Sequence, residues 1–99
     1  MKGHSVIATD VLASYAADAA KDVPGVTELV ESALHRHKGV RVLADDDGGL
    51  SVELHLAVAW GSSIPEVARG VQRHVAEYLA EMAGVRPAAV NVVVDEVAL

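Results

Sequence analysis

Apolar and polar residues alternate over residues 50–60, and this period of two predicts a long strand with one buried face. The residues on the apolar side are Val52, Leu54, Leu56, Val58 and Trp60. The other side carries Glu53, His55, Ala57 and Ala59. A shorter alternating run, residues 40–44, comes just before the turn residues 45–49 (Asp-Asp-Asp-Gly-Gly). The two runs are therefore expected to form a β-hairpin.

The segment that follows predicts a helix over residues 63–84. Ser63 and Glu66 have the spacing of a capping box, and Pro65 is tolerated in the first turn because its missing N–H would have no partner there. Gly84 is the expected C-terminal cap. The expected buried stripe consists of Ile64, Val67, Val71, Val75, Tyr78, Leu79 and Met82. A strand is expected again at residues 88–97, so this helix would connect two parallel strands as a right-handed crossover.

The N-terminal part of the chain predicts a second, alanine-rich helix. Residues 6–8 (Val-Ile-Ala) are interpreted as a short extended segment, after which Thr9 or Asp10 caps the helix. Pro24-Gly25 ends it, because the residue before a proline is pushed out of the helical region. The apolar stripe of this helix consists of Leu12, Tyr15, Ala16 and Ala19.

Residues 26–33 are interpreted as a strand, because the segment between Gly25 and Gly39 is too short for a long helix and two turns. Residues 35–39 are expected to form a basic turn or loop. Both helices must bury their stripes on the same side of the sheet. We therefore expect one α+β domain over residues 1–99: a two-layer sandwich in which a three- to four-stranded mixed sheet has two helices packed on one face.

Composition narrows the classes of function. The formal net charge is −6, which disfavours binding to nucleic-acid backbones and to anionic lipid surfaces. The chain has no cysteine, so disulfides and thiolate metal sites are excluded. No apolar stretch reaches the roughly 20 residues that span a bilayer, and the first residues lack the apolar region of a signal peptide. A cytoplasmic protein without direct membrane insertion is expected.

The sheet face opposite the helices is the candidate contact surface. The residues expected on it are Arg41, Leu43, Glu53, His55, Ala57, Ala59, Asn91, Val93, Asp95 and Val97. Such a face is often simply solvated. The alternative is a surface for self-association or for a protein partner, because the apolar members would form an unusually large exposed patch. The small side chains of Ala57 and Ala59 would let a partner approach closely.

No catalytic, cofactor or metal site is predicted. His35 and His37 lack a third ligand with a defined spacing, and residues 45–47 are better explained as turn residues than as calcium ligands. His55 and His74 are interpreted as surface histidines. No phosphate-binding loop and no serine with a nucleophile signature occurs. The basic residues 35–38 with Arg41 lack the aromatic residues and clamp loop of a nucleic-acid site.

Five motifs stand out along the chain: the Val-Pro-Gly-Val turn at 23–26, Trp60-Gly61 after a long strand, the helix sequence 64–75, Met-Ala-Gly-Val at 82–85 and Val-Asn-Val-Val-Val at 90–94. Together they resemble the alkaline shock protein family, the envelope stress response proteins of bacteria. The chain departs from the family pattern at Trp60, where tyrosine is usual, and at Ala83, where threonine is usual. Its residues 26–39 are also less rich in glycine.

The resemblance implies a non-enzymatic scaffold or interaction protein, without cofactors, in cell-envelope stress or homeostasis. It also implies a homo-oligomer, or a cytoplasmic protein held near the membrane through a membrane-embedded protein partner. Two other classes stay open on the order of elements. One is a small-molecule-sensing regulatory domain of ferredoxin-like topology, and the other is a nucleic-acid binder of KH-like order, which the negative charge disfavours.

Overall fold

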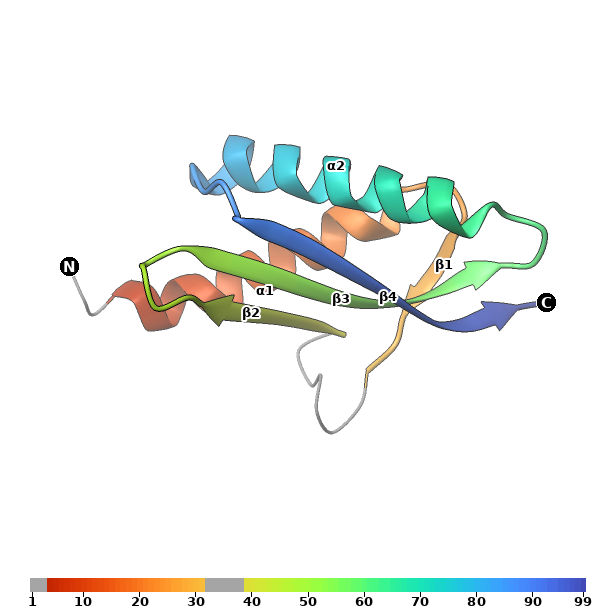
Figure 1. The fold of residues 1–99 in the computed structure, drawn as a ribbon, viewed down its shortest axis with the longest axis horizontal. Helices are drawn as coiled ribbons and strands as arrows, with labels where there is room; N and C mark the ends of the chain where they lie inside the picture. The colour runs from red at the N-terminus through yellow and green to blue at the C-terminus, as the bar shows by residue number, and fades with distance from the viewer. Residues whose placement is uncertain (1–3, 32–38) are drawn as a thin grey trace.

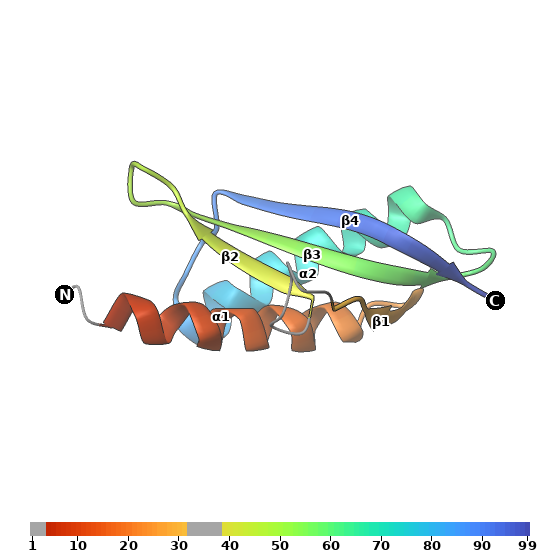
Figure 2. The same cartoon turned by 90° about the horizontal axis from the view of Figure 1, so that it is seen from below.

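The computed structural model describes the backbone of residues 4–31 and 39–99, and the side chains of residues 9–31 and 39–99. The elements along the chain are α1 (His4–Lys21), β1 (Val26–Leu29), β2 (Val40–Ala44), β3 (Leu50–Ala59), α2 (Ile64–Ala83) and β4 (Ala89–Ala98) (Figure 1). Both helices lie on the same side of one four-stranded mixed sheet (Figure 2). The predicted α+β sandwich with one helix-covered face is confirmed.

β3 is the central strand, with two short antiparallel strands along one edge and one long parallel strand along the other. β2 pairs antiparallel with its first half, from Leu50 to Leu54, and β1 pairs antiparallel with Leu56 to Val58. The N–H of His55 donates to the carbonyl of Gly39 (3.0 Å), and its carbonyl accepts from the N–H of Val30 (2.8 Å). Because both groups of one residue point to the same edge in an antiparallel ladder, β2 and β1 follow one another along that edge. β4 occupies the other edge.

The predicted crossover is also present. β4 pairs with β3 in parallel, from Ser51 opposite Ala89 to Ala59 opposite Ala98, and α2 connects the two strands. From Val52 to Val58, the side chains of β3 that face the helices are fully buried. Together with residues of α2 they make the centre of the core, whose largest members are Val52, Leu54, Leu56, Val58, Val71, Val75 and Leu79.

The sequence predicts the two ends of α2 correctly. The hydroxyl of Ser63 accepts from the N–H of Glu66 (3.4 Å), and Gly84 adopts the left-handed conformation that closes the last turn. The buried stripe of α2 is shorter than expected, because Ile64 and Met82 are 41% and 49% exposed. They stand in the first and last turns of the helix, beyond the part that the sheet covers. Trp60 was expected in the core but is 73% exposed, since it follows the last residue of β3 and leaves the sheet in a turn.

The N-terminal expectations are partly wrong. α1 begins at His4, so residues 6–8 are helical and neither Thr9 nor Asp10 caps the helix. A three-residue apolar run fits a helix as well as a strand, and here the helix continues through it. The helix does end before Pro24, as expected. β1 confirms the expected strand only over Val26–Leu29, while residues 32–38, with the expected basic loop, lie outside the described residues.

Candidate functional site

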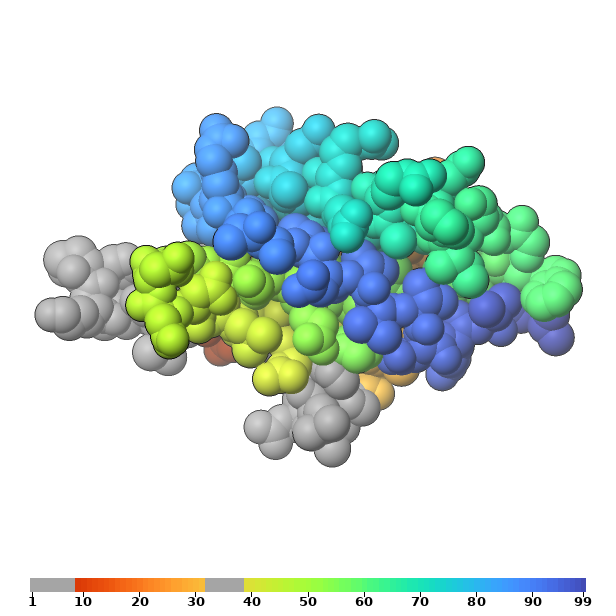
Figure 3. Space-filling view, viewed as in Figure 1, coloured from red at the N-terminus to blue at the C-terminus, as the bar shows by residue number. Residues whose placement is uncertain are grey.

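The sheet face that the helices leave open is turned toward the viewer in Figure 3, with β4 crossing it. The strand register brings the predicted contact residues together on this face. Arg41 lies opposite Glu53 and Leu43 opposite Ser51, while on the other side of β3 Asn91 lies opposite Glu53 and Val93 opposite His55. Ala59 stands at the far end of the same row. Apart from Val97, the residues chosen from the sequence therefore share one surface.

His55 is the buried centre of this face, with 8% of its surface exposed. Its Nε2 lies 2.7 Å from Oε2 of Glu53, and its Nδ1 lies 2.8 Å from Oδ2 of Asp95. Ionised carboxylates only accept hydrogen bonds, so both contacts are hydrogen bonds only when each ring nitrogen carries a proton, that is, in the imidazolium form. Burial alone lowers the pKa of His55, but the hydrogen bonds and charges of Glu53 and Asp95 outweigh it and raise the pKa above its ordinary value of 6.5.

This arrangement corrects the interpretation of His55 as a plain surface histidine. A sequence signal was present, because Glu53 and His55 are two residues apart on a strand and must share a face. The second carboxylate could not be found in this way. Asp95 is 40 residues away, and its approach to His55 depends on how β4 is set against β3.

β4 contains a bulge at Asp95, the residue that contacts His55. Leu56 lies opposite Val94 but Ala57 lies opposite Glu96, which leaves Asp95 as an extra residue in the ladder. The bulge also shifts the alternation of the residues that follow. Val97 comes to lie beside the core residue Val58, on the helix side, so its expected place on the open face is wrong.

Ala57 is not accessible for the close approach of a partner that its small side chain predicts. It has no exposed surface, and its register neighbours are Glu28 on β1 and Glu96 on β4. The hydroxyl of Thr27 donates to the carbonyl of Ala57 (3.0 Å). The large exposed apolar side chains on this face are Leu43 and Val93. Instead of an apolar patch, the face is a charged surface with these two apolar residues beside it.

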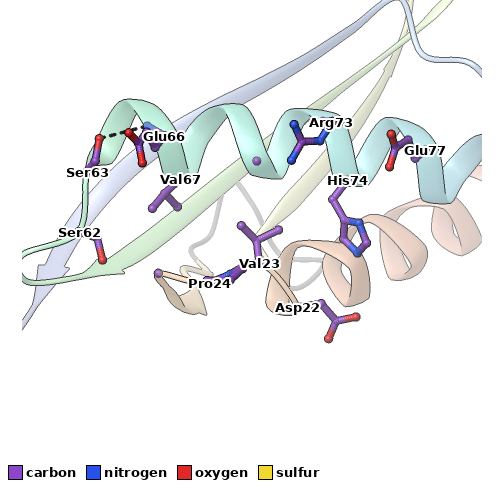
Figure 4. A pocket seen from close by; sticks show the side chains of 12 residues that line it. Asp22, Val23, Pro24, Ser62, Ser63, Glu66, Val67, Arg73, His74 and Glu77 are labelled. Atoms are coloured by element: carbon purple, nitrogen blue, oxygen red, sulfur yellow. Dashed lines mark hydrogen bonds between the residues drawn. The ribbon is translucent and has the colours of Figure 1, made fainter.

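A groove of about 560 Å³ lies on the helix side, between the first half of α2 and the turn from α1 to β1 (Figure 4). It is lined by Asp22, Val23, Pro24, Gly25, Ser62, Ser63, Glu66, Val67, Gly70, Arg73, His74 and Glu77. Gly25 has a φ of +97°, and a Cβ added there would stand 2.6 Å from Cγ2 of Val67. The floor of the groove is thus a tight contact between the turn and α2. Its charged residues are exposed or half-buried and of mixed sign, so they do not converge on one ligand.

Two further observations concern metal binding and membrane crossing in the described part of the chain. Within residues 9–31 and 39–99, no group of three or more His, Asp or Glu side chains is arranged to hold a metal ion. The pair His35 and His37 lies outside this part of the chain. Neither α1 nor α2, as far as they are described, is long and apolar enough to cross a bilayer.

Solved structures with the same fold include the MamM CTD. A doubly substituted form is similar with a TM-score of 0.64 and 16% identity, covering 88% of this chain and 81% of that one. A manganese form, at 15% identity, has a TM-score of 0.56 and covers 88% of this chain and 96% of that one. At this level of identity the likeness concerns the fold.

Similarity in sequence is more specific. The uncharacterized protein YqhY of Bacillus subtilis (strain 168) is 34% identical over 101 residues, which cover 91% of this chain and 73% of YqhY. Residues 1–99 also match the alkaline shock protein family, which is described as having a "cell envelope-related function". This match agrees with the resemblance in the turn, strand-end and helix motifs. The chain therefore belongs to the alkaline shock protein family.

Proposed function

We propose that the protein is a non-enzymatic interaction module of bacterial cell-envelope stress or homeostasis, which binds a protein partner through its open sheet face. The observation that carries this proposal is the contrast between the two faces of the sheet. One is closed by α1 and α2, and the other presents the exposed side chains of Arg41, Leu43, Asn91, Val93 and Asp95 on a rigid support. The family description, a cell envelope-related function, supports the setting.

The partner we propose is a membrane-embedded protein that anchors this chain from the cytoplasmic side, or a second copy of the chain in a homo-oligomer. No cofactor is needed for this role. Val93 stands next to His55 by register, and Leu43 lies on the outer strand β2. A partner seated on the face would cover both apolar residues and the carboxylates between them. Apolar contacts inside a polar rim are the usual composition of such interfaces.

Replacing Val93 with Arg tests the face. Val93 is 38% exposed, so the substitution leaves the core intact, and we expect the variant to keep its melting temperature but lose partner capture. Val11→Arg is the matched control, because Val11 is 41% exposed and stands on α1, on the other side of the molecule. Capture is measured by installing a photo-crosslinking residue at Leu43 in living cells and identifying the crosslinked protein. Equal capture by the Val93 and Val11 variants would rule out the open face, and sedimentation velocity over a range of concentrations separates a second copy from another partner.

A second candidate function is a ligand-sensing regulatory domain. The observation that favours it is the shared fold with the MamM CTD, for which manganese and zinc forms are known. A thermal shift of several degrees with manganese, zinc or a panel of metabolites would support this function. A shift with a metal ion would also call for ligands beyond the described residues, since no group of three or more metal-binding side chains occurs among these.

A further inference from the structure

We propose that protonated His55 is a latch that fixes the C-terminal part of β4 to the sheet, and that loss of its proton releases this part. The inference rests on the proposed function in one respect only, namely that β4 forms one side of the docking face. It adds the regulation of that face by pH. The latch itself is a property of the chain alone.

The two contacts of the ring are both satisfied only when the ring is protonated. With Glu53 at one ring nitrogen and Asp95 at the other, two donors are needed for two acceptors. A neutral imidazole has one N–H, so deprotonation removes one of these hydrogen bonds. The backbone of His55 is fixed by bonds to Gly39 and Val30, so the ring cannot follow a carboxylate that moves away.

The groups that face the ring favour its positive charge. In the described part of the chain, Glu53 on β3 and Asp95 on β4 contact the ring, and strand register places Glu28, Glu96 and Arg41 on neighbouring positions of the same face. Four of these five side chains are carboxylates. Once the imidazolium loses its charge, it no longer offsets the repulsion between Glu53 and Asp95, and Asp95 belongs to an edge strand. The raised pKa of His55 agrees with this balance.

The part of β4 after the bulge is held by less apolar burial than the part before it, although Glu96, Val97 and Ala98 still pair with Ala57, Val58 and Ala59. Before the bulge, Val90, Val92 and Val94 pack against the core. After it, Val97 is 45% exposed, and Asp95 sits at the interruption of the ladder. The hydrogen bond from the N–H of Trp60 to the carbonyl of Ala98 (2.8 Å) remains, but it lies at the very end of the strand. The tie between His55 and Asp95 therefore lies at the one residue of β4 that the ladder skips, next to a segment with little apolar burial.

The predicted motion can be measured as local opening, without a partner. Amide hydrogen exchange, which reports free energies of local opening, is followed by NMR over about pH 6 to 9. At each pH the rate is expressed as protection relative to an unstructured chain. We expect the protection of Glu96, Val97 and Ala98 to fall by roughly tenfold as His55 loses its proton, the size expected for one hydrogen bond to a charged group. The protection of residues 91–94 should stay constant. The ring nitrogen shifts of His55 should show two N–H groups at the acid end.

Two variants and one control complete the test. His55→Gln should show low protection of residues 96–98 at every pH, and Asp95→Asn, at an exposed site, should lower the pH at which protection is lost. His74→Gln, which changes the half-buried histidine of α2, should behave like the unmodified protein. The proposal is overturned if His55 loses its proton at or below pH 6.5, or if protection of residues 96–98 has the same pH course in the His55 and His74 variants. If protection of residues 96–98 depends on pH as expected but the Val93→Arg variant still captures its partner, the docking proposal is refuted and the latch is not.

Discussion

The two faces of β3 are held by different forces. On the helix side, Val52, Leu54, Leu56 and Val58 have almost no exposed surface and are fixed by close packing with the helices. On the open side, His55 is almost as buried, but it is fixed by hydrogen bonds to two carboxylates. Along β3, residues held in place by packing thus alternate with a residue held in place by charged hydrogen bonds.

The difference matters because the two forces respond to different conditions. Burial of one aliphatic side chain stabilises by about 1.5–3 kcal/mol and does not change with pH. A hydrogen bond to a charged group contributes about the same, but only while the charge is present. The protein can therefore alter its open face without unfolding the layer beneath it. Three substitutions, taken from the largest expected effect to the smallest, test this division.

Val75→Asp should abolish folding. Val75 has no exposed surface and lies in the stripe of α2 that meets the sheet, so the substitution would place an unpaired carboxylate in the core. We expect no cooperative thermal transition by circular dichroism. Arg73→Asp introduces the same group two residues earlier at an exposed position and should leave the transition in place. A melting temperature near that of the unmodified protein for the Val75 variant would mean that the buried face of α2 is assigned wrongly.

Gly25→Ala should lower the free energy of unfolding by less than Val75→Asp does, through steric effects alone. The added Cβ would stand 2.6 Å from Cγ2 of Val67, on a backbone with a φ of +97°, so clash and strain add to roughly 2–4 kcal/mol. Gly48 has a similar φ of +90° but nothing within 4 Å of an added Cβ, so Gly48→Ala measures the strain alone, about 1 kcal/mol. Urea denaturation gives both free energies of unfolding. Equal losses would show that the turn after α1 packs loosely on α2.

The helix-covered side could be predicted from the sequence because its signals are local. The alternation of Val52 to Val58 indicated the buried face of β3, and the spacing of Ser63 and Glu66 together with Gly84 indicated both ends of α2. In each case the residue types within a few positions are enough to predict the element, without knowledge of distant contacts. The parallel pairing of β3 with β4 followed from the handedness of the crossover.

The open side could be predicted only in part, because its geometry depends on contacts between distant strands. Strict alternation placed Asp95 and Val97 on one face, but the bulge in β4 separates them. No residue type near Asp95 indicates a bulge, since the extra residue is defined only against the partner strand. The long-range part of the charge cluster therefore could not be predicted from the sequence.

The smallest expected effect concerns the charge-dependent side, and it is a change of stability with pH. The pKa of His55 is raised in the folded state, so its contribution is fully present below about pH 6.5, the unfolded value, and is lost as the pH rises through the higher folded value. The free energy of unfolding should thus decline by on the order of 1 kcal/mol over this window, measured by urea denaturation at constant ionic strength. His55→Gln should remove the decline, whereas His74→Gln should keep it. Parallel pH profiles for these two variants would show that the hydrogen bonds of His55 to Glu53 and Asp95 do not stabilise the fold, and that the open face is held by packing like the face beneath it.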